Sequence, residues 1–79
     1  MMIEVKVLFE TIDRVKKFVS IANRFDIDMD IISGRYTIDA KSILGIFSMD
    51  LLKPLVLQVY AQQDEAEKVL EALKDYIVE

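Results

Sequence analysis

The sequence contains no histidine, no cysteine and no tryptophan, and it has only two glycines and one proline among 79 residues. Without cysteine there is no disulfide, thiolate nucleophile or cysteine-ligated zinc. Without histidine the chain lacks the usual general base near neutral pH and the commonest metal ligand. The low glycine and proline content excludes collagen-like and low-complexity classes. Any chemistry must therefore use hydroxyls, carboxylates, amines or binding alone, and no metal or cofactor is expected.

The charge balance is acidic, with 10 basic and 14 acidic side chains and a net charge of -4. Nucleic-acid-binding proteins normally carry a basic excess, so no nucleic-acid partner is expected. Apolar runs are short and interrupted by charges, so we expect no membrane insertion. The first residues, MMIEVKV, lack the basic-then-apolar pattern of a signal peptide. The sequence therefore predicts a cytoplasmic location.

The hydrophobic periodicity predicts seven short elements in the order β-α-β-β-α-β-α, within a single domain formed by residues 1–79. Alternating apolar residues indicate strands over residues 3–9, 26–32, 35–40 and 55–61. The predicted hairpin turn is Ser33-Gly34. The clean alternation favours an antiparallel sheet with one covered and one solvated face. The predicted fold class is therefore α+β, with three helices on one face of a four-stranded antiparallel sheet.

The three helices are predicted from apolar stripes and from residues that suit helix ends. Thr11 is a good N-cap for the first helix, and Ser42 for the short second helix, which Lys53-Pro54 ends. The first helix is predicted to bury Ile12, Val15, Phe18, Val19 and Ala22. The last is predicted to bury Ala66, Val69, Leu70, Leu73 and Ile77, and the return strand to turn Tyr36, Ile38 and Ala40 inward.

The segment before and within the predicted second helix is Ala40-Lys41-Ser42-Ile43-Leu44-Gly45-Ile46-Phe47-Ser48-Met49. Together with the order of elements, it resembles HPr, the small phosphocarrier of the sugar phosphotransferase system. That family carries Ala-Lys-Ser, two apolar residues, Gly, two apolar residues, and Ser-Leu. Phe18-Val19, Ala22 and Phe25 fall where the first helix of the family has core residues. The resemblance covers essentially the whole chain, and it implies an HPr-like open-faced β-sandwich.

The resemblance also identifies what is missing. In the family a phosphate-accepting histidine opens the first helix, and an arginine that clamps the phosphate follows two residues later. Counting back from Phe18-Val19, these positions hold Thr11 and Asp13. Glu10 and Asp13 would repel a phosphate here. The resemblance therefore implies a divergent member without the active-site histidine, and Thr11 is interpreted as a plain N-cap.

Ser42 is the candidate for regulatory phosphorylation, because in Gram-positive members of the family a dedicated kinase phosphorylates the matching serine. A phosphate at a helix N-terminus meets free N–H groups and the positive end of the helix dipole. Lys41 is adjacent and could help to screen the added charge. The alternative, that Ser42 only caps the helix, stays open and is compatible with phosphorylation.

An apolar cluster of Ile43, Leu44 and Phe47 surrounds this serine and, with Lys41, is the candidate docking surface for partners. On so short a helix, Ile46 and Met49 are expected to point inward, which leaves the cluster at the surface. Exposed apolar clusters often mark interaction sites. That these residues are merely core stays an alternative. The resemblance implies an HPr-type serine kinase, a transcriptional regulator or phosphotransferase components as partners.

The outer face of the sheet offers two further groups. Leu8, Val56 and Tyr60 are expected to form a modest apolar patch through which the chain could form a homodimer. Aspartates along one strand, with one from the next, are interpreted as a solvated face and not as a metal site: Asp26, Asp28, Asp30 and Asp39.

The functional hypothesis is a regulatory or adaptor protein of phosphotransferase origin that acts through Ser42 and the adjacent apolar patch. The alternative is a structural or interaction module, or a subunit, without phosphorylation. Because the sequence has no Gly-rich phosphate loop, nucleophile elbow or metal-ligand spacing, we do not expect an enzyme.

Overall fold

The strands pair into one four-stranded sheet with the order β1-β4-β2-β3, in a computed structural model that describes residues 1–78. All neighbouring strands are antiparallel. The strands are β1 (Met2–Val7), β2 (Asp28–Ser33), β3 (Tyr36–Asp39) and β4 (Leu55–Tyr60). The helices are α1 (Ile12–Ala22), α2 (Ile43–Phe47) and α3 (Gln63–Ala72), followed by a 3-10 helix, η1 (Lys74–Tyr76).

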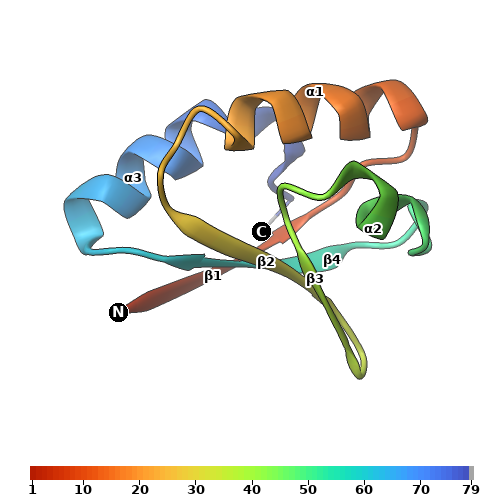
Figure 1. Ribbon diagram of the computed structural model, residues 1–79, viewed down its shortest axis with the longest axis horizontal. Coiled ribbons are helices and arrows are strands. Elements are labelled where there is room, and N and C mark those ends of the chain that lie inside the picture. Colours follow the sequence, from red (N-terminus) through yellow and green to blue (C-terminus); the bar gives the residue numbers. More distant parts are fainter. Residues whose placement is uncertain (79) are drawn as a thin grey trace.

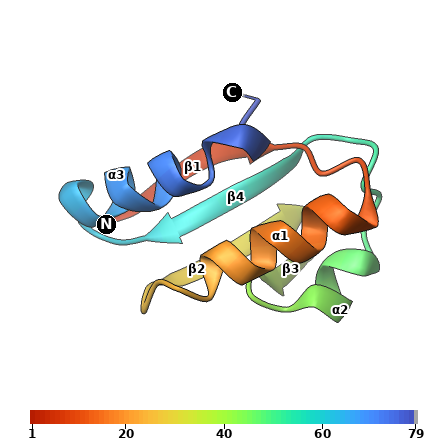
Figure 2. The same ribbon diagram turned by 90° about the horizontal axis from the view of Figure 1, so that it is seen from above.

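The helices cover one face of this sheet and leave the other face open (Figure 1). Seen from above, α1 lies between α3 and α2, with α2 at the side of β3 (Figure 2). The predicted fold class, α+β with three helices on one face of a four-stranded antiparallel sheet, is confirmed. None of the helices formed by residues 1–78 has the length and apolar content that crossing a bilayer requires.

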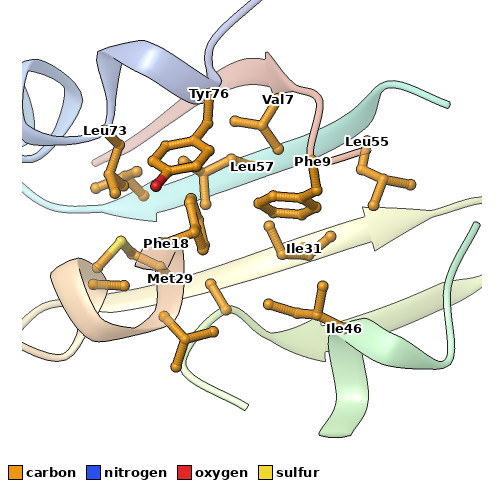
Figure 3. Packing of buried hydrophobic residues seen from close by; sticks show 14 of the residues in the cluster. Val7, Phe9, Phe18, Met29, Ile31, Ile46, Leu55, Leu57, Leu73 and Tyr76 are labelled. Atoms are coloured by element: carbon orange, nitrogen blue, oxygen red, sulfur yellow. The ribbon is translucent and has the colours of Figure 1, made fainter. Parts of the chain in front are cut away.

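The core lies between the sheet and the helices. Its side chains form rows across the sheet that follow the pairing of the strands. Leu57 of the central strand β4 pairs with Val5 on one side and Ile31 on the other. Side chains from α1, α2, α3 and η1 close over these rows (Figure 3). The most deeply buried large residues are Phe9, Phe18, Met29, Ile31, Ile46, Leu57 and Leu73. Each such side chain contributes about 1.5–3 kcal/mol when it leaves water.

The first helix begins as predicted, with Thr11 as its N-cap. Its inner face buries Val15, Phe18, Val19 and Ala22, but Ile12 is 56% exposed, so its predicted burial is wrong. A helical side chain covers the turn that precedes its own Cα. For the first residue of α1 that position lies beyond the start of the helix.

The hairpin differs from the prediction by one residue. Ser33 still pairs with Tyr36 in the sheet, so the loop is Gly34-Arg35 and not Ser33-Gly34. Gly34 has a φ of 57°, a conformation that glycine adopts without strain. Tyr36 shares the inner face of β3 with Ile38, as predicted, but it is not buried, since the residue is 72% exposed. The tip of the hairpin bends away from the helices (Figure 1), which leaves Tyr36 largely open to solvent.

The last helix ends earlier than predicted. It stops at Ala72, and Ile77 forms a β-bridge with Val7 instead of a helical turn. The backbone N–H of Leu8 donates to the carbonyl of Tyr76 at 2.8 Å, and that of Val78 donates to the carbonyl of Lys6 at 2.9 Å. The end of the described chain therefore runs along the outer edge of β1.

Candidate functional site

The start of α1 holds the two residues at the positions of the family's histidine and arginine, Thr11 and Asp13. Both side chains are exposed. The Thr11 hydroxyl oxygen accepts a hydrogen bond from the Arg14 backbone N–H at 3.1 Å, which is ordinary N-capping geometry. Glu10, just before it, has a φ of 74°, and its N–H donates to the carbonyl of Leu51 at 2.8 Å. The backbone before α1 is thus tied to the loop that follows α2.

The Arg14 side chain is occupied by the protein itself. Its Nε donates to the Phe9 carbonyl at 2.7 Å, and its Nη2 donates to the carbonyls of Leu8 and Asp75, each at 3.1 Å. The guanidinium carbon lies 4.8 Å from the centroid of the Tyr76 ring. This role leaves no periodic signal in the sequence, because none of these contacts is local enough, and it was not predicted. The one arginine in this turn therefore fastens the turn to η1 and does not point to a free anion site.

Ser42 occupies the N-cap of α2, as predicted. Its Oγ accepts a hydrogen bond from the Gly45 N–H at 3.2 Å, and its own N–H donates to the Asp39 carbonyl at 2.9 Å. The side chain is half-buried. Gly45 is required for this geometry, since a Cβ there would clash with the Cγ2 of Ile38 and come within 3.1 Å of the Ser42 hydroxyl.

Lys41, proposed to screen a phosphate on Ser42, makes two other contacts. Its Nζ donates to the carbonyl of Phe25 at 2.6 Å, and its backbone N–H donates to Oδ1 of Asp39 at 2.9 Å. The lysine thus connects the segment before α2 to the turn that follows α1. To screen a phosphate at Ser42, its ammonium group would have to leave Phe25.

The apolar residues around Ser42 are not equally available. Leu44 is 79% exposed, whereas Ile43 and Phe47 are half-buried and pack against the core. Ile46 is fully buried and Met49 is half-buried. The structure therefore leaves Leu44 as the prominent member of the predicted docking cluster.

Two exposed apolar residues at the same end of the molecule were missed by the sequence analysis. Ile12 is 56% exposed and Leu52 is 76% exposed. Because the Glu10 N–H donates to the Leu51 carbonyl, the start of α1, which holds Ile12, lies close to the loop that holds Leu52. Leu52 could have been found from the sequence, because it belongs to no apolar stripe. Ile12 could not, because it continues the stripe of α1.

The outer sheet face is more polar than the modest apolar patch predicted from Leu8, Val56 and Tyr60 implies. Leu8 follows the end of β1, and Gln58 lies between Val56 and Tyr60 on β4. Gln58 accepts a hydrogen bond from the Tyr60 hydroxyl at 2.7 Å and donates one to Glu4 at 2.8 Å. A polar row therefore crosses the predicted patch, and a homodimer through it stays a prediction.

Carboxylates gather beside this row. Asp30 is opposite Asp39 across β2 and β3, and opposite Gln58 across β2 and β4. The neighbouring Asp30 carboxylate raises the pKa of Tyr60 through hydrogen bonding and its charge, with a smaller contribution from the charge of Glu4. Within residues 1–78 no group of three or more carboxylates is arranged to hold a metal ion.

Comparison with known proteins identifies a matching family model and several similar solved structures. The family model described as "PTS HPr component phosphorylation site" matches residues 14–79, so the match begins after Thr11 and Asp13. The chain is similar to the phosphocarrier protein HPr of Bacillus anthracis, with 30% identity, 96% of each chain covered and a TM-score of 0.76. No curated protein shows significant sequence similarity to it.

Two further solved structures share the fold. HPr-C-His of Thermoanaerobacter tengcongensis is 24% identical over 95% of this chain and 88% of its own, with a TM-score of 0.69. The protein Crh of Bacillus subtilis, described as a dimer with a swapping domain, is 23% identical over the same shares, 95% and 88%, with a TM-score of 0.65. The family match and the Bacillus anthracis relative agree over most of the sequence. The chain therefore belongs to the HPr family of the phosphotransferase system.

Proposed function

We propose that this chain is a cytoplasmic regulatory or adaptor member of the HPr family that acts through Ser42 and a nearby apolar surface. A sequence without histidine cannot carry phosphate on an imidazole. Crh, whose name refers to catabolite repression, has the same fold. We therefore propose a regulatory role of this kind for the present chain. The observation that carries the proposal is a capping serine, Ser42, two residues from the highly exposed Leu44.

The geometry of Ser42 suits a phosphorylation site that leaves the domain folded. The hydroxyl oxygen accepts only the Gly45 N–H, at 3.2 Å, within the described part of the chain. A phosphoryl group on that oxygen would meet the N–H groups of the first turn of α2, and the first turn carries no acidic residue to oppose it. Phosphorylation would thus add charge beside Leu44 without requiring α2 to unfold.

The docking half of the proposal rests on exposed apolar side chains at this end of the molecule. Leu44, Ile12 and Leu52 are named here the docking surface. All three are exposed, and the hydrogen bond from Glu10 to Leu51 holds the backbones of the α1 start and the following loop together. Exposed apolar residues are typical of protein contacts when they form one surface, and we propose that these three do so. We propose an HPr-type serine kinase and a transcriptional regulator or phosphotransferase component as partners.

The first experiment tests phosphorylation. The protein is incubated with ATP and an HPr-type serine kinase, and the mass of the intact chain and of its peptides is measured. We expect the gain of one phosphoryl group on Ser42, its loss in Ser42→Ala, and its retention in Ser48→Ala. Ser48 is a good control because its hydroxyl lies at the other end of α2, where it donates to the Gly45 carbonyl at 2.6 Å. An unmodified wild-type chain would refute the regulatory half of the proposal.

The second experiment tests docking. Leu44→Gln should weaken capture of the kinase or regulator, because it removes the most exposed apolar side chain of the docking surface. Val78→Gln is the matched control, since Val78 is also exposed but lies beside β1. Equal capture by wild type and Leu44→Gln would show that the docking surface is not used.

A second candidate function has its own support: an interaction module without phosphorylation. The Ser42 hydroxyl already serves as a cap, and the Lys41 ammonium already binds the Phe25 carbonyl. In this case Ser42→Ala costs only the cap, about 1 kcal/mol, and changes no partner. Wild type and Ser42→Asp would then capture the same proteins. Sedimentation of the wild-type chain at high concentration shows whether a second copy is among those partners.

A further inference from the structure

The two edges of the sheet differ in what lies beside them. The end of β1 is bordered by the C-terminal segment, where the Leu8 N–H donates to the Tyr76 carbonyl and the Val78 N–H to the Lys6 carbonyl. The other edge strand, β3, pairs with β2 and with no further strand of the described chain. Since α2 lies on the helical side of β3 (Figure 1), an added strand in the plane of the sheet would pass beneath that helix.

The backbone of Thr37 points its hydrogen-bonding groups toward this open edge. The Ala40 N–H donates to the Met29 carbonyl at 2.9 Å, so the backbone of Ala40 faces β2. In an antiparallel pair, successive residues alternate between facing the partner strand and facing away from it. Asp39 and Thr37 therefore lie one and three residues out of phase with Ala40 and face away from β2. In agreement, the Asp39 carbonyl accepts from the Ser42 N–H at 2.9 Å.

The edge strand has few of the features that keep natural edge strands from pairing. Such strands usually carry proline, lysine or a β-bulge. The sequence of β3 is Tyr-Thr-Ile-Asp, and three of these four residue types favour strands. It pairs with β2 residue for residue, so it contains no bulge. What remains at this edge is one charge at either end, Arg35 just before the strand and Asp39 as its last residue.

These two charges select a second copy of the chain as the occupant of the edge. Arg35, Thr37 and Asp39 alternate with Tyr36 and Ile38, so they belong to the outer face of the strand. When two copies pair in antiparallel orientation with Thr37 opposite Thr37, Arg35 of each copy is opposite Asp39 of the other. In a parallel pairing the like charges would be opposite one another, which is destabilising. The edge is therefore complementary to itself in one orientation.

The acidic end of the edge is suited to an incoming guanidinium. Asp39 is opposite Asp30 across β2 and β3, so two carboxylates share this part of the outer face. Lys41 is the nearest cation along the chain, but its Nζ donates to the Phe25 carbonyl at 2.6 Å. Oδ1 of Asp39 accepts from the Lys41 backbone N–H, which carries no charge. Arg35 of a second copy would thus meet two carboxylates.

We propose that two copies of this chain pair through β3, in antiparallel orientation about Thr37, and so join their sheets into one. The twofold symmetry makes every contact occur twice. The Thr37 backbones exchange N–H···O bonds, Arg35 pairs with Asp39, and Tyr36 lies beside Ile38 of the other copy on the inner face. Tyr36 is 72% exposed in the single chain, and the pairing gives its ring an apolar neighbour. Because β3 is short, the dimer is weak and forms at high concentration.

The first measurement is sedimentation of the full chain from about 10 μM to about 1 mM. We expect a reversible monomer–dimer equilibrium. Thr37→Pro removes the outward N–H, which the pairing with β2 does not use, and it should abolish the dimer. Thr37→Val keeps that N–H and is the matched control, with a dissociation constant within about twofold of wild type. Thermal unfolding of each variant checks that the fold is retained.

The second measurement is a charge exchange that distinguishes this pairing from other modes of association. Arg35→Asp and Asp39→Arg should each raise the dissociation constant about tenfold or more, because like charges then lie opposite one another. The two variants should associate when they are mixed, since each presents the charge that the other lacks. The double variant Arg35→Asp/Asp39→Arg should again form its own dimer. Lys16→Asp makes a similar charge change on the exposed side of α1 and should have little effect.

Three outcomes would overturn the proposal. One is a chain that stays monomeric at about 1 mM. Another is a dimer that Thr37→Pro and Arg35→Asp leave intact, which would place the contact elsewhere on the surface. The third is a dimer that exchanges subunits only on unfolding, because that behaviour indicates a swapped domain such as the one described for Crh. Phosphorylation of Ser42 and capture of partners by Leu44 are measured separately, so their failure and the failure of this pairing are distinguishable.

Discussion

The guanidinium carbon of Arg14 lies 4.8 Å from the centroid of the Tyr76 ring. Arg14 belongs to the first turn of α1, and Tyr76 to η1 near the other end of the chain. The ring continues an aromatic cluster, with centroids 5.4 Å from Phe18 and 6.3 Å from Phe9. Because the same guanidinium donates to three backbone carbonyls, one side chain holds the start of α1 against the C-terminal segment.

Replacing Arg14 should therefore destabilise the fold even though the residue is charged. Arg14→Ala removes three charge-assisted hydrogen bonds and the contact with the Tyr76 ring. We expect the free energy of unfolding, measured in urea, to fall by about 2–3 kcal/mol. The free energy of unfolding of Arg14→Lys should lie between those of wild type and Arg14→Ala, because an ammonium group cannot reproduce the forked set of guanidinium hydrogen bonds. Lys16→Ala, exposed on the same helix, should change stability by less than about 0.5 kcal/mol; an equal loss there would contradict the role of Arg14.

Gly45 should tolerate no side chain while Ile38 is present. Gly45→Ala places a Cβ against the Ile38 Cγ2 and close to the Ser42 hydroxyl. We expect a loss of about 1–3 kcal/mol in the free energy of unfolding. In the Ile38→Ala background the clash is gone, so the same substitution should cost markedly less. A double-mutant cycle measures this coupling. Additive effects would mean that the Ile38 methyl moves away without cost.

Most of the fold could be predicted from local patterns. The period-two strands and the caps at Thr11 and Ser42 depend on neighbouring residues alone, and the structure shows both caps. The resemblance to HPr, carried by residues 40–49, agrees with the family match. The wrong predictions occur where packing between distant segments determines the local structure. Ile77 leaves the helical pattern because it forms a bridge with Val7.

The same reason limits what could be predicted of the candidate site. Exposure of Leu44 was expected, but the half-burial of Phe47 depends on how α2 lies against the core. Lys41 follows Asp39 by two residues, yet its ammonium binds Phe25, from a turn far earlier in the chain. No sequence spacing encodes such a contact. The roles of Ser42 and Lys41 in phosphorylation stay predictions for the kinase experiment.

Glu10 should be a site where glycine stabilises the protein. Its φ of 74° lies in the left-handed region, which costs a non-glycine residue about 1–2 kcal/mol. Glu10→Gly relieves this strain but makes the unfolded chain more flexible, by about 0.5–1 kcal/mol. We therefore expect a net gain of about 0.5–1 kcal/mol in the free energy of unfolding. Glu10→Gln keeps the Cβ and removes the charge, so an equal gain there would show that charge and not backbone strain is responsible.

Asp30 should control the titration of Tyr60. The hydrogen-bonding influence of this neighbouring carboxylate and its negative charge both raise the pKa of Tyr60 above the usual 10.0. A raised pKa means that the protonated phenol favours the folded state, so this contribution is present below about pH 10 and is lost as the pH rises through the folded pKa. Asp30→Asn should lower the pKa of Tyr60, read from tyrosinate absorbance as the difference from Tyr60→Phe in each background. Asp64→Asn removes the same charge from α3 and should leave this pKa unchanged. Identical titrations of Asp30→Asn and Asp64→Asn would show that the phenol does not sense Asp30.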